Sequence, residues 1–288
     1  MSTCPKSFIL VLSCPDAVGI VATVTQELAK HGALITEAHH FREPVSSSTV
    51  LRIVFEAGGS TPLDIAHLTR DFGAAAQRFG MIWKIYDSLT PLRILVAVSK
   101  QGHCLKSILH RWEIGTLSAN VVGVVSNHED QRRIADWYGL PFYHLPIEPG
   151  RKEDQEEKLL SLFADRNAEL LVLARYMQIL TEQSCRQLAG RAINIHHSFL
   201  PGFKGANPYG QAHARGVKLI GATAHYVTAD LDEGPIIEQA VERVDHTMTV
   251  EQLTSIGNDI ESVVLNRAIQ WHSERRIFQF GNRTVVLR

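Results

Sequence analysis

The chain has 288 residues, which is enough for one large domain or two ordinary ones. Hydrophobic residues make up 45% and charged residues 20%, as in a globular protein with a real core, and the net charge of −1 disfavours a large basic surface for nucleic acid. Four scattered cysteines without a CxxC pair argue against a disulfide framework or a zinc ribbon and predict a reducing cytoplasm. The N-terminal apolar run is too short for a signal peptide, and no apolar stretch approaches membrane-spanning length.

The first part of the chain alternates between strand and helix periodicities. Strands are predicted at 8–13, 34–42, 49–57 and 81–86, and helices at 19–31 and 62–79. Gly32 stands where a helix C-cap glycine is expected, and Pro62 would lie in the first turn of the second helix. The order β-α-β-β-α-β is typical of a small ferredoxin-like domain. We therefore expect one domain over residues 1–88 and a second over 89–288.

The second part contains near-continuous apolar runs at 92–98, 121–126 and 170–174, which indicate strands buried on both faces of a parallel sheet. Helices are predicted at 103–113, 129–138, 152–166, 181–189 and 249–274. Further strands are predicted at 192–196, 221–227 and 235–243, and a hairpin around Gly281 closes the chain. Alternating strands and helices predict a doubly wound α/β domain with a mostly parallel sheet.

Asn194 and His196 end one of these strands, where ligands of an open α/β sheet bind. They lie two residues apart, so their side chains point to the same side. An amide and an imidazole there could bind a carbonyl oxygen as it becomes an oxyanion and deliver a proton to a leaving group. Alternatively, both could merely satisfy backbone groups at the strand end. The adjacent His197 is expected to diverge from His196 on a strand.

Three carboxylates follow in the loop TADLDEGP, namely Asp230, Asp232 and Glu233. One of them could orient the His196 imidazole or help to position a water molecule, provided that the two strands are neighbours. A solvated acidic turn is the simpler alternative.

Two other stretches could contact a ligand. ARYMQIL at 174–180 offers an apolar and aromatic wall with backbone amides, which would suit a flat heterocycle, although packing alone explains it almost as well. SKQGHC at 99–104 has a glycine at a strand-to-helix turn that could expose amides to an anion. It has neither GxGxxG nor a Walker lysine, so a dinucleotide or P-loop site is a weak interpretation. No HExxH or zinc-like spacing accompanies the 14 histidines, so we expect no metal.

The strings NIHHSFLPGFKGANPY, GATAHYVTADLDEGPIIEQ and ARYMQIL resemble the hydrolases and transferases that use 10-formyltetrahydrofolate, and most specifically their deformylase branch, the formyltetrahydrofolate deformylases. The resemblance covers essentially all of residues 92–288. The segment 8–86, with its PDAVGIVATV turn, is similar to the ACT regulatory domain of this branch. The resemblance thus implies a ferredoxin-like ACT domain followed by a Rossmann-like formyltransferase domain.

The resemblance also implies the reaction: 10-formyltetrahydrofolate and water give tetrahydrofolate and formate, either for purine synthesis or to balance the one-carbon folate pool. It implies Asn194, His196 and Asp232 as catalytic residues, with His225 in support. Folate is then the substrate rather than a cofactor, and no nucleic acid or membrane partner is expected. The implied substrate contacts are Arg175, Met177, Gln178, Leu180, His197, Thr228, Ala229, Asp230 and Leu231, while a contact between Lys204 and the glutamate tail stays open.

Other readings remain. A glycinamide ribonucleotide transferase needs a phosphate cradle after the first strand of the larger domain, for which SKQGHC is poor, and a methionyl-tRNA formyltransferase needs a basic surface that this nearly neutral chain lacks. The chain could also be an inactive folate- or amino-acid-sensing protein, although the intact catalytic residues argue against it. The ACT resemblance implies a homo-oligomer (dimer or tetramer) and an amino-acid effector near Asp16, Ala17, Val18 and Gly19; alternatively, this domain serves assembly alone.

Overall fold

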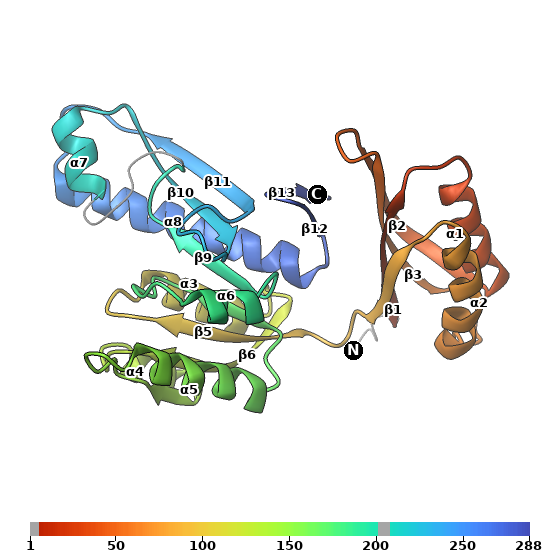
Figure 1. Cartoon of the computed structure of the whole chain (residues 1–288), viewed down its shortest axis with the longest axis horizontal. Helices are drawn as coiled ribbons and strands as arrows, with labels where there is room; N and C mark the ends of the chain where they lie inside the picture. The colour runs from red at the N-terminus through yellow and green to blue at the C-terminus, as the bar shows by residue number, and fades with distance from the viewer. Residues whose placement is uncertain (1–5, 201–207) are drawn as a thin grey trace. The chain divides into compact units, whose positions relative to one another are not determined.

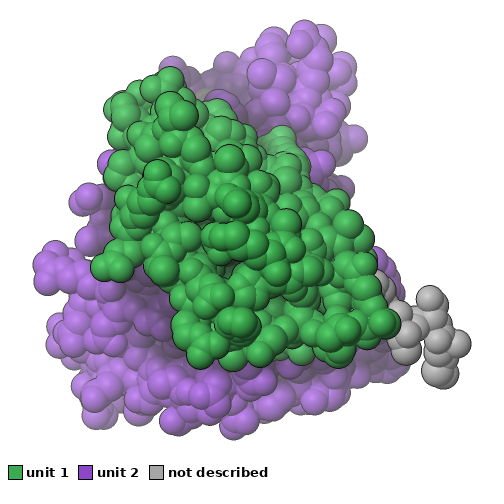
Figure 2. All heavy atoms as spheres, turned by 90° about the vertical axis from the view of Figure 1, so that its right-hand side faces the viewer, with its two compact units in different colours: residues 1–91, 275–280, 285–288 green, residues 92–274, 281–284 purple. Residues whose placement is uncertain are grey.

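A computed structural model describes residues 6–200 and 208–288 (Figure 1). Lys204, whose contact the sequence left open, lies outside the described residues. The chain forms two compact units, coloured separately in Figure 2. Unit 1 contains the described residues up to Pro91 together with 275–280 and 285–288, and unit 2 contains 92–274 and 281–284.

Unit 1 is a four-stranded antiparallel sheet with two helices. Its elements are β1 (Ser7–Pro15), α1 (Ile20–Lys30), β2 (Ala33–Glu43), β3 (Ser48–Ala57), α2 (Ile65–Arg78) and β4 (Ile82–Asp87). The sheet order is β2-β3-β1-β4, with every pair antiparallel. The predicted order β-α-β-β-α-β is confirmed. Both helices pack apolar residues such as Leu28 and Phe72 against strand residues such as Leu10 and Phe55, which gives the unit its own core.

Local capping explains where the helices of unit 1 end and begin. Gly32 follows the C-terminal residue of α1 and its cap His31 with φ +72°, a left-handed conformation that favours glycine. The prediction that α2 begins at residue 62 is wrong. Asp64 is the N-cap, and its side chain accepts a hydrogen bond from the His67 backbone N–H, so the helix starts at Ile65.

Unit 2 contains a seven-stranded sheet of order β11-β10-β9-β8-β5-β6-β7. Within the sheet, β9, β8, β5, β6 and β7 pair with one another in parallel, whereas β10 is antiparallel to both of its neighbours. The predicted mostly parallel sheet is therefore confirmed. The strands are β5 (Leu92–Val98), β6 (Ala119–Ser126), β7 (Phe142–His144), β8 (Leu170–Leu173), β9 (Ala192–His196), β10 (Leu219–Tyr226) and β11 (Ile236–Arg243).

Helices cover this sheet. They are α3 (His103–Glu113), α4 (Arg132–Trp137), α5 (Lys152–Asp165), α6 (Glu182–Gln187), α7 (Pro208–Arg215) and α8 (Val250–Ser273). The long α8 packs along β9, β10 and β11 and against α3, as Figure 1 shows for β10 and β11. Leu159 and Phe163 of α5 join Leu95 and Leu171 of the sheet in a buried core. β7 and α7 were not predicted, whereas the closing hairpin of β12 (Ile277–Phe280) and β13 (Arg283–Val286) was.

The topology brings two distant parts of the sequence together beside β9. β10 pairs with β9 so that Thr223 faces His196 and His225 faces Asn194. The loop after β10 therefore starts next to the strand that carries Asn194 and His196. No helix in the described part of the chain is long and apolar enough to cross a membrane.

Candidate active site

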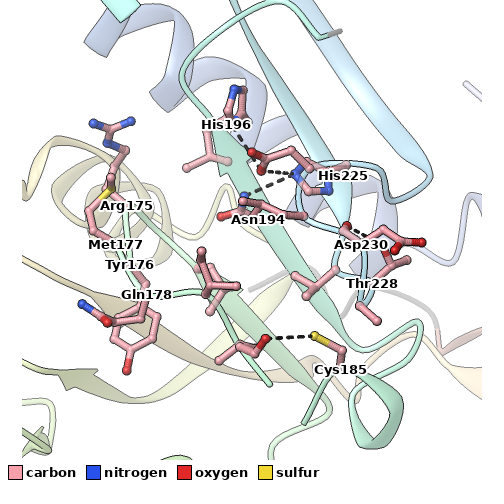
Figure 3. Close-up of a pocket in the computed structure, with 18 of the residues that line it drawn as sticks. Arg175, Tyr176, Met177, Gln178, Cys185, Asn194, His196, His225, Thr228 and Asp230 are labelled. Atoms are coloured by element: carbon pink, nitrogen blue, oxygen red, sulfur yellow. Dashed lines mark hydrogen bonds and ion pairs between the residues drawn. The ribbon is translucent and has the colours of Figure 1, made fainter. Parts of the chain in front are cut away.

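The strand end and the acidic loop meet as the sequence analysis required. The His196 Nδ1 atom lies 3.2 Å from Oδ1 of Asp232, and the side chains of His196 and Asp232 are 5% and 11% exposed. The Asn194 Nδ2 atom lies 3.2 Å from the Nε2 atom of His225. Figure 3 shows Asn194 and His225 facing each other from the adjoining strands β9 and β10, with the His196 ring beyond them. An amide, two imidazoles and a carboxylate thus share one buried position.

Asp232 reaches this position because its loop folds tightly onto the end of β10. The Tyr226 N–H donates to the Pro235 carbonyl at 3.0 Å, which closes the loop. A Cβ atom at Gly234 would lie 1.7 Å from the Tyr226 carbonyl oxygen, so only glycine fits there. Asp232 itself has φ +59°, a conformation that costs free energy in most residues and that aspartate tolerates better than most.

Asp232 is held ionised. Burial alone would raise the pKa of its carboxyl, but the contacts with His196 and His225 outweigh burial and hold the pKa far below the usual value. The Asp232 carboxylate therefore stays negatively charged throughout the neutral and mildly acidic range. It can hold the His196 ring by its Nδ1–H and stabilise a positive charge on that ring.

His225 orients the Asn194 amide. The His225 Nδ1 atom lies 2.9 Å from the Tyr226 carbonyl oxygen, which can only accept, so Nδ1 carries a proton. While the ring is neutral, Nε2 accepts one amide N–H of Asn194; when the ring is protonated, Nε2 instead donates toward Oδ1 of Asp232, which lies 3.7 Å away. The second N–H of the Asn194 amide remains for a ligand in the cavity.

The other nitrogen of the His196 ring has no partner in the part of the chain that the structure describes. Its Nε2 atom is buried and forms no hydrogen bond with the described residues. Orphaned buried polar atoms are uncommon and often mark a functional position. The expectation that His197 diverges from His196 is wrong, because β9 ends at His196 and the two rings stack with centroids 5.0 Å apart.

One cavity of about 300 Å³ contains all of these groups. It is lined by each substrate contact that the sequence analysis named and by the four residues above: Arg175, Met177, Gln178, Leu180, Asn194, His196, His197, His225, Thr228, Ala229, Asp230, Leu231 and Asp232. The lining also includes Tyr176 and Ile179 of the predicted wall at 174–180, together with Leu173, Cys185, Ile195 and Val227, whose residue types carried no signal of a site. The mixture of apolar walls and few polar groups suits a small organic ligand.

Comparisons with known proteins identify the family to which the chain belongs. The formyl transferase family model matches residues 92–269. A formyltetrahydrofolate deformylase from Corynebacterium sp. (strain P-1) is 47% identical over 280 residues, which covers 97% of this chain and 98% of that protein. The chain belongs to the formyltetrahydrofolate deformylase family.

Solved structures place the deformylase family beside a related one. The crystal structure of the formyltetrahydrofolate deformylase from Burkholderia mallei has 51% identity and a TM-score of 0.94, covering 99% of this chain and 100% of that one. The crystal structure of glycinamide ribonucleotide transformylase 1 from Symbiobacterium toebii has 30% identity and a TM-score of 0.67, covering 70% of this chain and 97% of that one.

The wall of this deformylase-family cavity at 175–180 is anchored from behind. Glu156 of α5 is buried, and its carboxylate accepts hydrogen bonds from the Thr181 N–H and hydroxyl and from the Ser184 hydroxyl. The Ser99 hydroxyl accepts from the Met177 N–H at 3.0 Å. These bonds fix the backbone of the wall, so that its amides are pre-positioned for a ligand.

Burial also acts on the wall's aromatic residue. It raises the pKa of Tyr176 to about 12, although the hydrogen bond from Gln155 opposes this. The Tyr176 hydroxyl is therefore neutral and serves as a hydrogen-bonding group rather than as an acid or base.

A second polar group, the Glu261 cluster, was not predicted. It consists of Gln101, His103, Arg175, Tyr209 and Glu261. The Glu261 carboxylate is fully buried; it lies 2.8 Å from His103 Nε2, 2.7 Å from the Tyr209 hydroxyl and 3.5 Å from Arg175 Nε. Burial would raise the pKa of Glu261, but these partners hold it below the usual value. Gln101, His103 and Arg175 lie in the candidate stretches 99–104 and 174–180, but no motif links them to Tyr209 and Glu261, which lie far away in the chain.

His103, Cys104 and Glu261 together offer three atoms within 4.8 Å of one another, which is close enough for a metal ion. The donor set does not fit one well. Burial, reinforced by the charge of Glu261, raises the pKa of the Cys104 thiol, whereas a metal ligand must be a thiolate. The Arg175 guanidinium already stands beside the Glu261 carboxylate and opposes a second positive charge.

The expected effector residues of unit 1 form the turn between β1 and α1. Asp16 accepts a hydrogen bond from the Thr49 hydroxyl at 2.7 Å and pairs with Arg42. That hydrogen bond, together with the positive charge of Arg42, lowers the Asp16 pKa. Val18 is fully exposed, and Gly19 is the N-cap of α1, with φ +94°.

Proposed function

We propose that this chain hydrolyses 10-formyltetrahydrofolate to tetrahydrofolate and formate. The observation that carries the proposal is the convergence of Asn194, His196 and Asp232 on one cavity, in a chain with a relative, matched over 97% of this chain, that is named formyltetrahydrofolate deformylase. The reaction makes the chain a hydrolase of one-carbon folate metabolism.

In the proposed mechanism, Asp232 holds His196 and orients the attacking water. As the water oxygen bonds to the formyl carbon, one water proton passes to the Asp232 carboxylate, from which it later returns to His196, and the carbonyl oxygen becomes an oxyanion. The free N–H of Asn194 and the Nε2–H of protonated His196 stabilise this oxyanion. The intermediate then collapses, the bond from carbon to N10 breaks, and His196 supplies a proton to N10. The atoms balance as 10-formyltetrahydrofolate and water giving tetrahydrofolate, formate and a proton.

A single-turnover experiment tests the proposal. Purified protein treated with a chelator is mixed with authentic 10-formyltetrahydrofolate, and formate and tetrahydrofolate are measured over time. We expect both products in equal amounts from the wild type and severely slowed release from Asp232→Asn. Absence of formate from the folded wild type would contradict the proposed hydrolysis. Activity that appears only when metal is added would contradict the proposal that the chain uses no cofactor.

The pterin ring, in this proposal, lies between the wall at 175–180 and the loop at 228–232. Apolar side chains of both segments and the anchored amides of the wall support this placement. His197 closes the cavity beside His196, against which it stacks. Recognition would then rest largely on backbone groups.

We further propose that residues 1–88 form an ACT regulatory domain and residues 89–288 the catalytic domain of a cytoplasmic homo-oligomer. The antiparallel β-α-β-β-α-β unit supports the first part, and its exposed turn at 16–19 is the proposed amino-acid site. Calorimetric titration of the full chain with each of the common amino acids tests this. We expect one amino acid to give a binding heat with the wild type and none with the Asp16→Ala variant. A binding heat that persists in this variant would place the site elsewhere.

A further inference from the structure

The Glu261 cluster lies at the switch point of the sheet. β5 has β6 on one side and β8 on the other, and α3 begins at His103 shortly after β5 ends. In doubly wound sheets, anionic groups of ligands bind at this point, on the N–H groups that begin the first helix. Gly102 is the N-cap of α3 and offers no side-chain cap to those N–H groups. The fold therefore provides a phosphate position here.

In this chain, its own side chains occupy that position. The carboxylate of Glu261 lies beside the first residue of α3, and the Arg175 guanidinium lies between that carboxylate and Gln101, whose Oε1 atom accepts from Arg175 Nε at 3.0 Å. A Cβ atom at Gly102 would lie 2.1 Å from Gln131 Oε1, so the Gln131 side chain covers the turn before the helix.

Neighbouring elements are shaped to hold the cluster. A Cβ atom at Gly257 of α8 would lie 2.1 Å from the Tyr209 ring, so this glycine makes room for the tyrosine that donates to Glu261. Arg175 has φ +64°, which is unfavourable for a long side chain. Its Nη1 atom is buried and has no hydrogen-bond partner among the described residues. The chain thus tolerates strain and an unsatisfied donor to keep a guanidinium here.

We propose that the Glu261 cluster determines the acceptor of the formyl group, by closing the phosphate position so that water alone enters. This inference rests on the proposed hydrolase function. Arg175 also lines the catalytic cavity, so the closure borders the space in which the formyl group would react. A phosphorylated amine would need the volume that Arg175 fills, and its phosphate would meet the negative charge of Glu261.

A related transformylase indicates which acceptor the closed position would exclude. The structure from Symbiobacterium toebii is named for glycinamide ribonucleotide, an amine that carries a phosphorylated ribose. In such a transfer the amine nitrogen bonds to the formyl carbon, the bond from carbon to N10 breaks, and the proton lost by the amine is matched by the one gained at N10. The products are tetrahydrofolate and the formylated amine, in place of formate.

The wild-type protein provides the first test. Formate release is measured with and without glycinamide ribonucleotide, and separately with inorganic phosphate, each at millimolar concentration. We expect an unchanged rate and no formylated amine. Competitive inhibition by either compound would show an open phosphate position and overturn the proposal. Formate release without additions separately tests the hydrolase function, so the two failures are distinguishable.

Two double variants provide the second test. The variant Arg175→Gly with Glu261→Ala removes both charges together and empties the phosphate position. Glycine suits the positive φ of the backbone at 175. Arg175→Met with Glu261→Gln removes the charges but keeps the volume. The ratio of formylated amine to formate is measured in both, because this ratio does not depend on the overall rate. We expect it to rise at least about tenfold in the emptied variant alone. If this ratio did not rise in the folded emptied variant, or rose equally in both variants, the side chains would not exclude the phosphorylated amine by filling the position, and the proposal would be contradicted.

Discussion

At residue scale, the Asn194 amide is the donor best placed to bind an oxyanion, because His225 holds one of its N–H groups and leaves the other for the ligand. Removing one such donor typically costs about 3 kcal/mol of transition-state stabilisation, or a hundredfold or more in rate. We expect Asn194→Ala to lower kcat by about that factor, with KM changed much less. Steady-state kinetics on folded protein checks this. A kcat equal to that of the wild type would remove Asn194 from the mechanism.

The depressed pKa of Asp232 has a consequence for stability. A carboxylate whose pKa is lower in the folded state stabilises that state above its unfolded pKa of about 3.9 and loses this effect as the pH falls toward the folded value. We therefore expect the difference in unfolding free energy between the wild type and Asp232→Asn to shrink as the pH falls below about 4. Urea unfolding at a series of pH values measures it. A difference that grew on acidification would contradict the assignment.

The residues that the sequence revealed and those that it hid differ in physical kind. Asn194, His196 and Asp232 were recognised because they stand in short motifs at a strand end and in a turn. Glu261 was not, because it is one carboxylate on a long amphipathic helix and its partners Tyr209 and His103 lie 52 and 158 positions away. The end of β9 at His196 was predicted, but the stacking of His197 on His196 depends on the backbone beyond that end, for which the sequence carries no local signal.

At element scale, the β10–β11 loop depends on the glycine that lets it approach Tyr226. A methyl group at Gly234 would overlap the Tyr226 carbonyl oxygen, so the loop must shift and carry Asp232 with it. Because misplacement of a catalytic group by about 1 Å can cost a hundredfold, we expect Gly234→Ala to lower kcat by about that factor. Gly59→Ala is the control, since nothing lies within 4 Å of its added methyl. Equal activity of the two variants would show that this approach is not needed.

The cavity wall depends on α5 through Glu156. Replacing this carboxylate by an amide leaves a group that accepts fewer hydrogen bonds opposite Thr181 and Ser184. We expect Glu156→Gln to lower the unfolding free energy by about 1–3 kcal/mol and to raise KM for the folate, because the wall loosens. The adjacent exposed Glu157→Gln should change neither quantity. A raised KM in the control alone would contradict the argument.

Elements with strong periodicity were predictable, and short ones were not. The apolar runs of β5 and β8 and the long α8 stand out because burial on a sheet or a helix face imposes its own spacing. The three residues of β7 lie between Pro141 and Pro146, too few to display an alternation. The reversed direction of β10 leaves no local trace, because an antiparallel strand buried on both sides has the same apolar pattern as a parallel one.

At the scale of the whole molecule, one ligand should tie together three segments that are remote in sequence. The cavity is built from 175–180, 194–197 and 228–232, and it lies entirely within unit 2. Product binding at a hundred times its Kd would stabilise the folded state by about 2.7 kcal/mol. We therefore expect tetrahydrofolate to slow backbone hydrogen exchange in these three segments and to raise the thermal transition of the unit that contains them.

The same exchange experiment separates this site from the turn in unit 1. Tetrahydrofolate should not change the hydrogen exchange at 16–19, because that turn belongs to a unit with its own hydrophobic core. An amino-acid effector should slow the exchange there instead. Peptides from both regions are followed in one digest, with each ligand added alone and then together. If tetrahydrofolate slowed exchange at 16–19 and did not change it at 194–197, the folate site would lie in unit 1. The role assigned to His196 would then be wrong.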